Sequence, residues 1–443
     1  MEAAKIKTAS LHNLGCKVNA YEMDVMGQIL RRRGYKIVPF GEAADVCIIN
    51  TCTVTNIADR KSRQMLHKAR SENPDAVIVA VGCYVQTGLE DALSDEGIDL
   101  CIGNNNKSRI ADILERYLDE REAGRRDKMP GGDTVSDMKD CPYEKMELCE
   151  LSSRTRAYIK IQDGCNQFCS YCIIPFARGR VRCRDAEDIR KEVAGLAAKG
   201  ISEFVLTGIN VSTYGADELI ALLKGLDEIG DVKRIRLSSL EPRLFTEEFV
   251  RGLRSVEKLC PHFHLSLQSG SDSVLKRMNR HYDTKEYAAR AELLRCVFDD
   301  PAITTDIIAG FPGETEEEFE ETYAFARQMG FYEMHVFKYS RREGTVAAKL
   351  PGQLTDREKS VRSEKLIALG RQMSDEYTAR HLGLVREVLF EETRVIDGTE
   401  YICGHTPEYI HVAAEAKGEL SGRIEAVKLG GPVGCDYIKG ELN

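Results

Sequence analysis

The middle of the chain repeats one pattern of strand and helix. From Arg156 to Tyr339, a short apolar run alternates six times with a longer amphipathic stretch. Strands separated by helices of ten or more residues need right-handed crossovers, and they form a parallel sheet. Six units fall short of a closed eight-stranded barrel, so the sequence predicts a partial (β/α)6 barrel. The expected strands are Ala157–Gln162, Glu203–Leu206, Arg234–Ser238, His262–Gln268, Ala302–Ile308 and Glu333–Tyr339.

Other patterns predict further parts on both sides of this barrel, which spans residues 154–352. Residues 1–120 also alternate apolar and amphipathic stretches, which predicts a doubly wound parallel α/β domain. Residues 121–153 carry a Pro-Gly-Gly turn and mixed charge, and we expect a linker there. Residues 353–376 are charged and periodic, which favours a connecting helix. Residues 377–443 contain short strand-like runs, so we expect a small antiparallel β-barrel.

Helix-start signals give one local prediction inside the barrel. The run Gly310-Phe-Pro-Gly313 resembles a phosphate loop but lacks the Gly-Lys-Ser/Thr ending. Thr315 and Glu318 have the spacing of a helix capping box. A phosphate-binding loop and a purely structural turn therefore remain two readings of this segment.

Composition narrows the class of protein. The 443 residues are 42% hydrophobic and 30% charged, which is the balance of a globular chain. No apolar run has the length that crosses a bilayer, and the N-terminus lacks the hydrophobic stretch of a secretory signal. We therefore expect a cytoplasmic protein with no membrane partner. A net charge of −9 argues against a generic binder of polyanions such as DNA, so any nucleic-acid contact must be local.

Cysteine is the most unusual part of this composition. The chain has 15 Cys, 9 His and no Trp. Disulfides are not a plausible use for these thiols in a reducing compartment, which points to metal or redox chemistry. Because His is scarce, thiols must supply most of the ligands of any metal site.

The first candidate site follows the first barrel strand. Cys165, Cys169 and Cys172 are spaced Cys-x3-Cys-x2-Cys. Three thiolates on one tight loop can reach three irons of a cubane and leave the fourth iron open. The alternatives are a structural zinc site completed by Cys183 and a Cys-x-x-Cys redox pair. The second paired knuckle of a zinc ribbon is absent at the usual spacing, and active sites occur at barrel strand ends, which favours iron–sulfur.

The second candidate site is dispersed in the sequence. Cys16, Cys52 and Cys83 each lie just past the carboxyl end of a predicted parallel strand. In a doubly wound sheet these ends share one edge, so the three loops can converge on one metal centre. Cys47 and Cys101 fall within predicted strands and are expected to be small core residues.

The three-Cys spacing, with Tyr171 just before the last Cys, resembles the motif of the radical S-adenosylmethionine superfamily. This resemblance implies that the open iron binds S-adenosylmethionine and that electron transfer yields a 5′-deoxyadenosyl radical. It also implies that residues at the strand ends hold the cofactor. The expected cofactor-binding residues are Tyr171, Gly208, Asn210, Ser239, Gln268 and Asp306.

From end to end, the chain resembles the radical methylthiotransferase family, whose members carry a β-rich TRAM-like tail. The family has a member for isopentenyladenosine in tRNA, one for threonylcarbamoyladenosine in tRNA and one for an aspartate of a ribosomal protein. The segments Leu14-Gly-Cys-Lys-Val-Asn-Ala-Tyr-Glu22 and Asn50-Thr-Cys-Thr-Val-Thr-Asn-Ile-Ala-Asp-Arg-Lys-Ser-Arg-Gln64 are most similar to the threonylcarbamoyladenosine member.

The resemblance implies a specific reaction and set of cofactors. A methylthio group would be added at C2 of N6-threonylcarbamoyladenosine at position 37 of tRNA, next to the anticodon. Two 4Fe–4S clusters would take part, one on Cys165, Cys169 and Cys172 and a sulfur-donating one on Cys16, Cys52 and Cys83. S-adenosylmethionine would be methyl donor and radical source, and a flavodoxin or ferredoxin-type reductant would supply electrons. The alternatives are the family's other two substrates and, in another class, a non-catalytic metal-containing RNA-binding protein.

Basic residues near both cysteine groups agree with an RNA substrate. Arg178, Arg180, Arg182 and Arg184 alternate along the chain, which would place their guanidiniums on one side of an extended segment. Arg60, Lys61 and Arg63 lie on the helix predicted after Cys52, where an ordinary solvated face is the alternative. From residue 377 onward there are 7 basic and 11 acidic residues, a net charge of −4, which argues against RNA binding through the tail.

Overall fold

The structure is a computed structural model that describes residues 7–124, 133–151, 155–415 and 418–442. The chain divides into two compact units. The first unit comprises Met1–Leu151, Lys160–Asp185 and Ser340–Ala348, and the second comprises Ser152–Ile159, Ala186–Tyr339 and Lys349–Asn443. The segment that carries Cys165, Cys169 and Cys172 therefore belongs to the same unit as the N-terminal domain.

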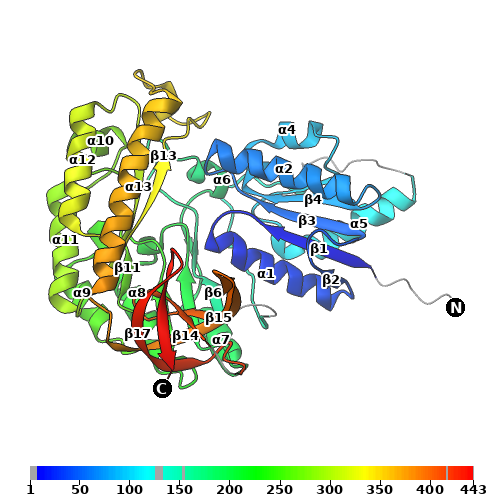
Figure 1. The fold of residues 1–443 in the computed structure, drawn as a ribbon. Coiled ribbons are helices and arrows are strands. Elements are labelled where there is room, and N and C mark those ends of the chain that lie inside the picture. The colour runs from blue at the N-terminus through cyan, green and yellow to red at the C-terminus, as the bar shows by residue number, and fades with distance from the viewer. Residues whose placement is uncertain (1–6, 125–132, 152–154, 416–417, 443) are drawn as a thin grey trace. The chain divides into compact units, whose positions relative to one another are not determined.

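The first unit is built on a parallel sheet of order β2-β1-β3-β4-β5 (Figure 1). Its strands are β1 (Thr8–Asn13), β2 (Lys36–Val38), β3 (Val46–Thr51), β4 (Val77–Gly82) and β5 (Leu100–Ile102). The central strands β3 and β4 are buried along their whole length, since helices cover both faces of the sheet. These helices are α1 (Lys17–Arg32), α2 (Asn56–Glu72), α3 (Cys83–Thr87), α4 (Leu89–Ser94) and α5 (Ile110–Glu122). The predicted doubly wound domain is confirmed.

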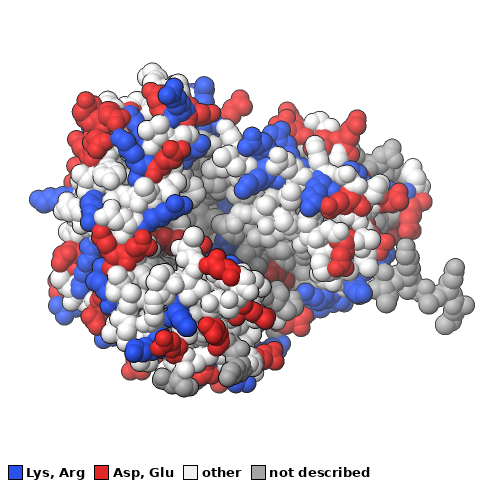
Figure 2. All heavy atoms as spheres, viewed as in Figure 1, with Lys and Arg blue, Asp and Glu red and all other residues white. Residues whose placement is uncertain are grey.

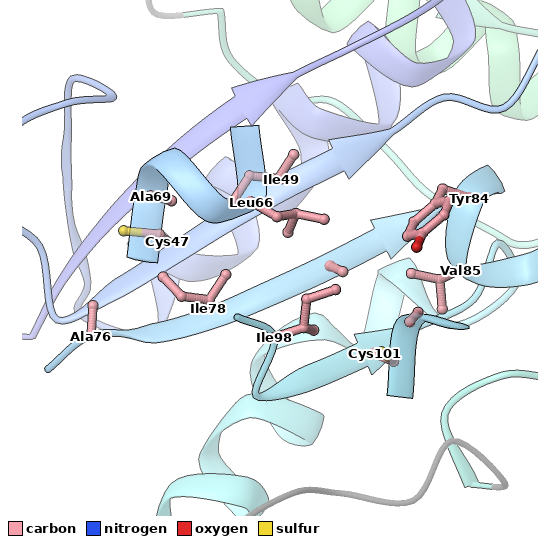
Figure 3. Packing of buried hydrophobic residues seen from close by; sticks show 12 residues of the cluster. Cys47, Ile49, Leu66, Ala69, Ala76, Ile78, Tyr84, Val85, Ile98 and Cys101 are labelled. Carbon is pink, nitrogen blue, oxygen red and sulfur yellow. The ribbon is translucent and has the colours of Figure 1, made fainter. Parts of the chain in front are cut away.

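The core on one face of this sheet joins the strands to α2, α3 and α4 (Figure 3). Ile49 and Ile78 of the strands pack with Leu66 of α2 and Val85 of α3. Burying each such side chain contributes roughly 1.5–3 kcal/mol. Cys47 and Cys101 are 1% exposed and lie in this core, as their positions within strands predicted.

The described part of the expected linker, residues 133–151, is more than a spacer. It packs on the first unit in an irregular conformation, with Met138, Met146 and Leu148 buried. The hydroxyl of Tyr21 donates to the carbonyl of Met146 at 2.8 Å, and Gln28 donates to that of Glu147 at 2.9 Å. These few buried apolar residues stand among charged ones in the sequence, so the composition of the segment did not predict that it would pack.

The first unit also contains a short antiparallel pair of strands. Strands β7 (Gln162–Asp163) and β8 (Arg182–Cys183) pair antiparallel, and helix α6 (Ile174–Arg178) lies between them in the chain.

The second unit contains the predicted partial barrel. Its six strands form two sheets of order β10-β9-β6 and β11-β12-β13, which single bridges such as Leu240 to Leu265 connect. The strands are β6 (Arg156–Lys160), β9 (Glu203–Thr207), β10 (Arg234–Leu237), β11 (His262–His264), β12 (Ala302–Ala309) and β13 (Glu333–Lys338). The helices are α7 (Ala186–Ala197), α8 (Ala216–Asp227), α9 (Glu247–Arg254), α10 (Asp272–Arg277), α11 (Thr284–Val297) and α12 (Glu316–Met329). Helix α12 begins at the predicted capping box of Thr315 and Glu318.

The C-terminal part of the second unit is a closed barrel of order β14-β15-β16-β18-β17. Helix α13 (Asp356–Ala379) precedes β14 (Val385–Ile396), β15 (Thr399–His405), β16 (His411–Ala414), β17 (Ile424–Val433) and β18 (Tyr437–Leu442). The predicted antiparallel barrel is confirmed, although the pair β16–β18 that closes it is parallel. Among the described helices, α13 included, none has both the length and the apolar composition needed to cross a membrane.

A buried ion network connects the two parts of the second unit. Glu203 of β9 is fully buried, and its carboxylate accepts from Arg236 Nε at 3.1 Å and lies 3.0 Å from His405 Nε2. Arg234 donates to the carbonyl of His405 at 3.1 Å. Burial by itself would raise the pKa of Glu203, but the charges of Arg236 and His405 hold it well below its usual range. Glu203 is therefore a buried anion that joins barrel strands to the C-terminal barrel.

We predict that Glu203→Gln destabilises the protein by about 3–5 kcal/mol, because the arginines around it lose their buried counter-charge. Urea unfolding followed by far-UV circular dichroism and tyrosine fluorescence measures this change. Glu400→Gln, at an exposed position on β15, is the control and should stay within about 0.5 kcal/mol of the parent. Equal urea midpoints for the two variants would contradict the role of Glu203 as a buried anion that holds the arginines.

Candidate metal centres

Three cysteines of the first unit lie at the carboxyl edge of its sheet. Strand β1 lies between β2 and β3, so the strand order reverses next to it. Ligands bind in doubly wound folds beyond the carboxyl ends of strands at such a reversal. Cys16 follows β1, Cys52 follows β3, and Cys83 follows β4 as the first residue of α3.

The structure brings these three loops together. A Cβ atom built on Gly15 would lie 2.9 Å from Cys52 Cβ, so the loops after β1 and β3 are in direct contact. The Cys52 thiol also interacts electrostatically with Cys83 and Cys16. Burial, with a contribution from Cys83, raises the pKa of the Cys52 thiol to about 12, so a metal must displace its proton. All three thiols are free of disulfides, and three soft donors at one edge fit an iron–sulfur cluster with one open iron.

Buried polar side chains tie the ends of these strands to one another. Asn19 Nδ2 donates to the carbonyls of Leu14, at 2.7 Å, and Thr51, at 3.0 Å. Asn50 Nδ2 in turn donates to the carbonyl of Asn19 at 2.9 Å. Sequence reasoning missed these residues, although Asn50 has a signal, a polar side chain near the end of an apolar strand. They hold the loops that carry Cys16 and Cys52 in one arrangement.

Glycine precedes two of these cysteines, and the geometry requires it. Gly15 and Gly82 have φ values of +99° and +101°, a region that other residues rarely adopt. A Cβ atom on Gly82 would lie 2.6 Å from Asn50 Oδ1. A side chain at either position would therefore displace the neighbouring loop.

The second cysteine group occupies one loop between β7 and α6. The amide of Cys165 donates to the carbonyl of Gly179 at 3.0 Å, and the amide of Cys172 donates to that of Cys169 at 3.0 Å. Gly164 has φ +72°, and a Cβ atom there would lie 1.9 Å from the carbonyl oxygen of Arg180. The two ends of the loop thus meet backbone to backbone. Its three cysteines form no disulfide and fit the ligand set of a cubane with one open iron.

The segment Ser340–Ala348 contacts both cysteine groups within the first unit. Arg342 Nη2 donates to Thr53 Oγ1 at 2.7 Å, directly after Cys52. The amide of Ala347 donates to the carbonyl of Ser170 at 2.7 Å, between Cys169 and Cys172. We call Ser340–Ala348 the strap. Sequence analysis placed it in the barrel and did not anticipate these contacts.

Five of the six expected cofactor-binding residues lie in the second unit. Gly208 and Asn210 follow β9, Ser239 follows β10, Gln268 follows β11 and Asp306 belongs to β12. The amide of Gln268 donates to the carbonyl of Asp306 at 2.8 Å, which brings two of these positions together. Carboxyl ends of barrel strands are where active sites form, and the cofactor role of these residues stays a prediction. Tyr171 is half-buried in the loop of the first unit.

Asp306 lies beside two histidines that the sequence analysis did not select. His264 Nε2 is 3.3 Å from Asp306 Oδ2, and the rings of His264 and His335 are 5.9 Å apart. His335 is the register partner of Asp306 on β13, so the two residues share one face of the sheet. The opposite face carries the buried Ile303 and Ile307. Register between neighbouring strands, which a single sequence does not give, was needed to find this polar triad.

The structure corrects part of the expected RNA-binding set. Arg178 is 1% exposed and donates to the carboxylates of Glu22 and Asp163, and Arg184 is also buried. Arg182 donates to the carbonyl of Arg178 at 2.6 Å, while Arg180 is exposed. The prediction of one exposed row of four guanidiniums is therefore wrong. The segment turns at the end of α6, and Glu22, an acidic partner, comes from a distant part of the sequence.

The basic residues of α2 have a different environment. Arg60, Lys61 and Arg63 are exposed. Figure 2 shows blue side chains gathered over the region that Figure 1 labels α2. Their helix starts four residues after Cys52, so this positive surface adjoins the first cysteine group.

We predict that Gly15→Ala lowers the bound iron of anaerobically reconstituted protein from about eight to about four atoms per chain, because its methyl group meets Cys52. Iron and sulfide assays measure this change. Gly34→Ala is the matched control, since Gly34 has φ +87° but no atom within 4 Å of an added Cβ. Full iron content in Gly15→Ala would show that the close contact is not needed.

Comparison with known proteins agrees with this arrangement. Residues 159–326 match the radical SAM superfamily, and residues 8–103 match uncharacterized protein family UPF0004. Threonylcarbamoyladenosine tRNA methylthiotransferase MtaB from Bacillus subtilis strain 168 is 40% identical over 95% of this chain and 93% of the relative. The protein of that name from Aquifex aeolicus strain VF5 is 38% identical over 94% and 99%.

A solved structure shows the same fold. The radical S-adenosylmethionine methyltransferase TsrM from Kitasatospora setae superposes with a TM-score of 0.59 over 88% of this chain and 81% of that chain, at 16% identity. The resemblance inferred from the cysteine motifs is confirmed by relatives that span nearly the whole chain. The chain belongs to the threonylcarbamoyladenosine tRNA methylthiotransferases of the radical S-adenosylmethionine methylthiotransferase family.

Proposed function

We propose that this chain adds a methylthio group to C2 of N6-threonylcarbamoyladenosine at position 37 of tRNA, next to the anticodon. The observation that carries the proposal is the presence of two groups of three cysteines, none in a disulfide, within one compact unit. Side-chain acid–base catalysis cannot activate an aromatic C–H bond of adenine, so a radical source is needed. The names of the full-length relatives support the choice of substrate.

Each cysteine group has its own role in this proposal. Cys165, Cys169 and Cys172 would hold the cluster that binds S-adenosylmethionine, and Cys16, Cys52 and Cys83 would hold the sulfur-donating cluster. The bound clusters supply the radical and the sulfur. The chain's own contribution is to fix the loops through Asn19, Gly82 and Gly164 and to keep Cys52 from water.

The second unit carries a group of polar residues of its own. Asp306 can accept hydrogen bonds from ribose hydroxyls or amines, while His264 and His335 can donate or accept. Together with Gln268 they form a polar face at the barrel strand ends, suited to a nucleoside or to S-adenosylmethionine.

The partners follow from the same chemistry. Arg60, Lys61 and Arg63 would contact tRNA phosphates beside the first cysteine group. A flavodoxin or ferredoxin-type protein would deliver the electrons, and the cytoplasm is the compartment in which such partners meet tRNA. The family's other substrates, isopentenyladenosine and a ribosomal-protein aspartate, are the alternatives within this chemistry. A non-catalytic metal-containing RNA-binding protein is the alternative outside it.

We predict that single Cys→Ala variants divide into two classes. Changes at Cys165, Cys169 or Cys172 abolish reductive cleavage of S-adenosylmethionine, because the open iron is lost. Changes at Cys16, Cys52 or Cys83 spare cleavage and abolish methylthio insertion. Chromatography of 5′-deoxyadenosine and mass spectrometry of tRNA nucleosides measure the two activities, with Cys47→Ala as a core-cysteine control. Identical behaviour of both classes would overturn the division of roles, and no cleavage in the parent would favour the RNA-binding alternative.

We predict that Lys61→Gln weakens binding of an anticodon stem-loop and lowers the slope of log affinity against log salt by about 0.7–0.9, the share of one phosphate contact. Fluorescence anisotropy over a series of salt concentrations measures the slope. Lys36→Gln is the control, since Lys36 is exposed at the amino end of β2. An unchanged slope in Lys61→Gln would remove α2 from the RNA interface.

A further inference from the structure

A buried cluster of charges joins segments that carry the two cysteine groups of the first unit. Glu22 of α1 is 0% exposed, and its carboxylate holds Lys107, Lys160 at 2.7 Å and Arg178 at 2.9 Å. Asp163, two residues before Cys165, pairs with Lys160 at 2.6 Å and with Arg178 at 3.1 Å. Residues from separate parts of the sequence therefore meet in one buried place.

The cluster has more cations than carboxylates. Arg182 approaches Asp163 at 3.7 Å, and the carboxylate of Glu144 interacts with Lys160 and Glu22 while it accepts from Ser108. Burial would raise the pKa of Glu22, but Arg178, Lys107 and Lys160 hold it well below its usual range. Among the described residues, the set thus pairs four cations, Lys107, Lys160, Arg178 and Arg182, with three carboxyl groups, and burial raises the pKa of one of these, Glu144. Excess buried charge is costly unless an anion lies nearby.

Arg178 links this cluster to all three N-terminal cysteines. Its Nη2 donates to Asn19 Oδ1 at 2.5 Å, and that oxygen lies 4.0 Å from Cys16 Sγ. The guanidinium interacts electrostatically with Cys52 and Cys83. Asn104 Nδ2 donates both to Cys83 Sγ, at 3.4 Å, and to the carbonyl of Ala177, the residue before Arg178.

Arg178 also belongs to the segment that carries the other cysteine group. It is the last residue of α6, and Gly179 next to it accepts the hydrogen bond from the amide of Cys165. Asp163, its ion-pair partner, lies at the opposite end of the same loop. One guanidinium is thus fixed by both ends of the Cys165–Cys172 loop while its charge faces Cys16, Cys52 and Cys83.

We propose that Arg178 is a positioning residue that sets the reduction potential of the cluster bound by Cys16, Cys52 and Cys83, and through which the loop of the other cluster acts on that potential. The proposal rests on the proposed function only for the identity of the bound group. A cluster held by thiolates gains negative charge on reduction. A fixed cation beside it therefore favours the reduced form and raises the potential.

The test is a redox titration of the holoenzyme without tRNA, followed by electron paramagnetic resonance. The signal that responds to added S-adenosylmethionine identifies the cluster of Cys165, Cys169 and Cys172, and the other signal is the one of interest. In Arg178→Gln this second midpoint should become more negative by about 59 mV or more, a tenfold change in the one-electron equilibrium. Arg178→Lys retains the charge, so it should change the same one-electron equilibrium constant by no more than about twofold.

Two further variants separate the charge of Arg178 from general loss of the cluster. Glu22→Gln removes an anion beside Arg178. In this variant the midpoint potential of the cluster bound by Cys16, Cys52 and Cys83 should therefore move in the opposite, positive direction. This sign still tests the proposal if Arg178→Gln does not fold. Lys107→Gln removes a different partner of Glu22 and controls for loss of a buried ion pair. Equal shifts in Lys107→Gln and Arg178→Gln, or shifts of one sign in Arg178→Gln and Glu22→Gln, would overturn the proposal.

The outcome is independent of the nucleoside substrate. Two titrating signals with no effect of Arg178→Gln would reject the role of Arg178 and leave the proposed function intact. Zinc in place of iron, with no such signal in the parent, would reject the proposed function and this inference together. Normal potentials with unmodified tRNA would reject the substrate alone.

Discussion

The pairing of Glu22 with Lys107, Lys160 and Arg178 is the interaction on which the first unit depends. Glu22 has no access to water, so its charge is tolerable only while these cations stay in place. Lys107 precedes α5, Lys160 ends β6 and Arg178 ends α6, and Glu22 therefore fixes three separate elements by one carboxylate. Both cysteine groups are attached to elements that this pairing holds.

Local patterns in the sequence were enough to predict the strands of the doubly wound sheet and of the partial barrel, and the edge at which Cys16, Cys52 and Cys83 meet. Strand β4 is an uninterrupted apolar run, and its carboxyl end follows directly from where that run stops. Arg178 shows the limit of the same reasoning. Its spacing with Arg180 suggested an exposed row, yet its partner Glu22 lies 156 residues away and is reached only through the fold. His335 was missed because its relation to Asp306 is one of strand register.

The second unit uses buried charge for a different purpose. Glu203, Arg236 and His405 join barrel strands to a C-terminal barrel whose sequence is acidic overall. Arg156 also stacks over the ring of Tyr409, 5.1 Å from its centroid, so basic and aromatic groups of this region serve internal contacts. A module of that charge is poorly suited to hold RNA by attraction alone. The exposed basic face of α2, in the other unit, is better suited to that task.

The strap has a consequence for the order in which the protein is made. The chain enters the first unit three times, and its last visit ends at Ala348. Until that residue has left the ribosome, Thr53 lacks the hydrogen bond from Arg342 and Ser170 lacks the one from Ala347. The six cysteines of the two groups have been synthesised more than 160 residues earlier. In a nascent chain, both cysteine groups are therefore complete before the last contacts around them form.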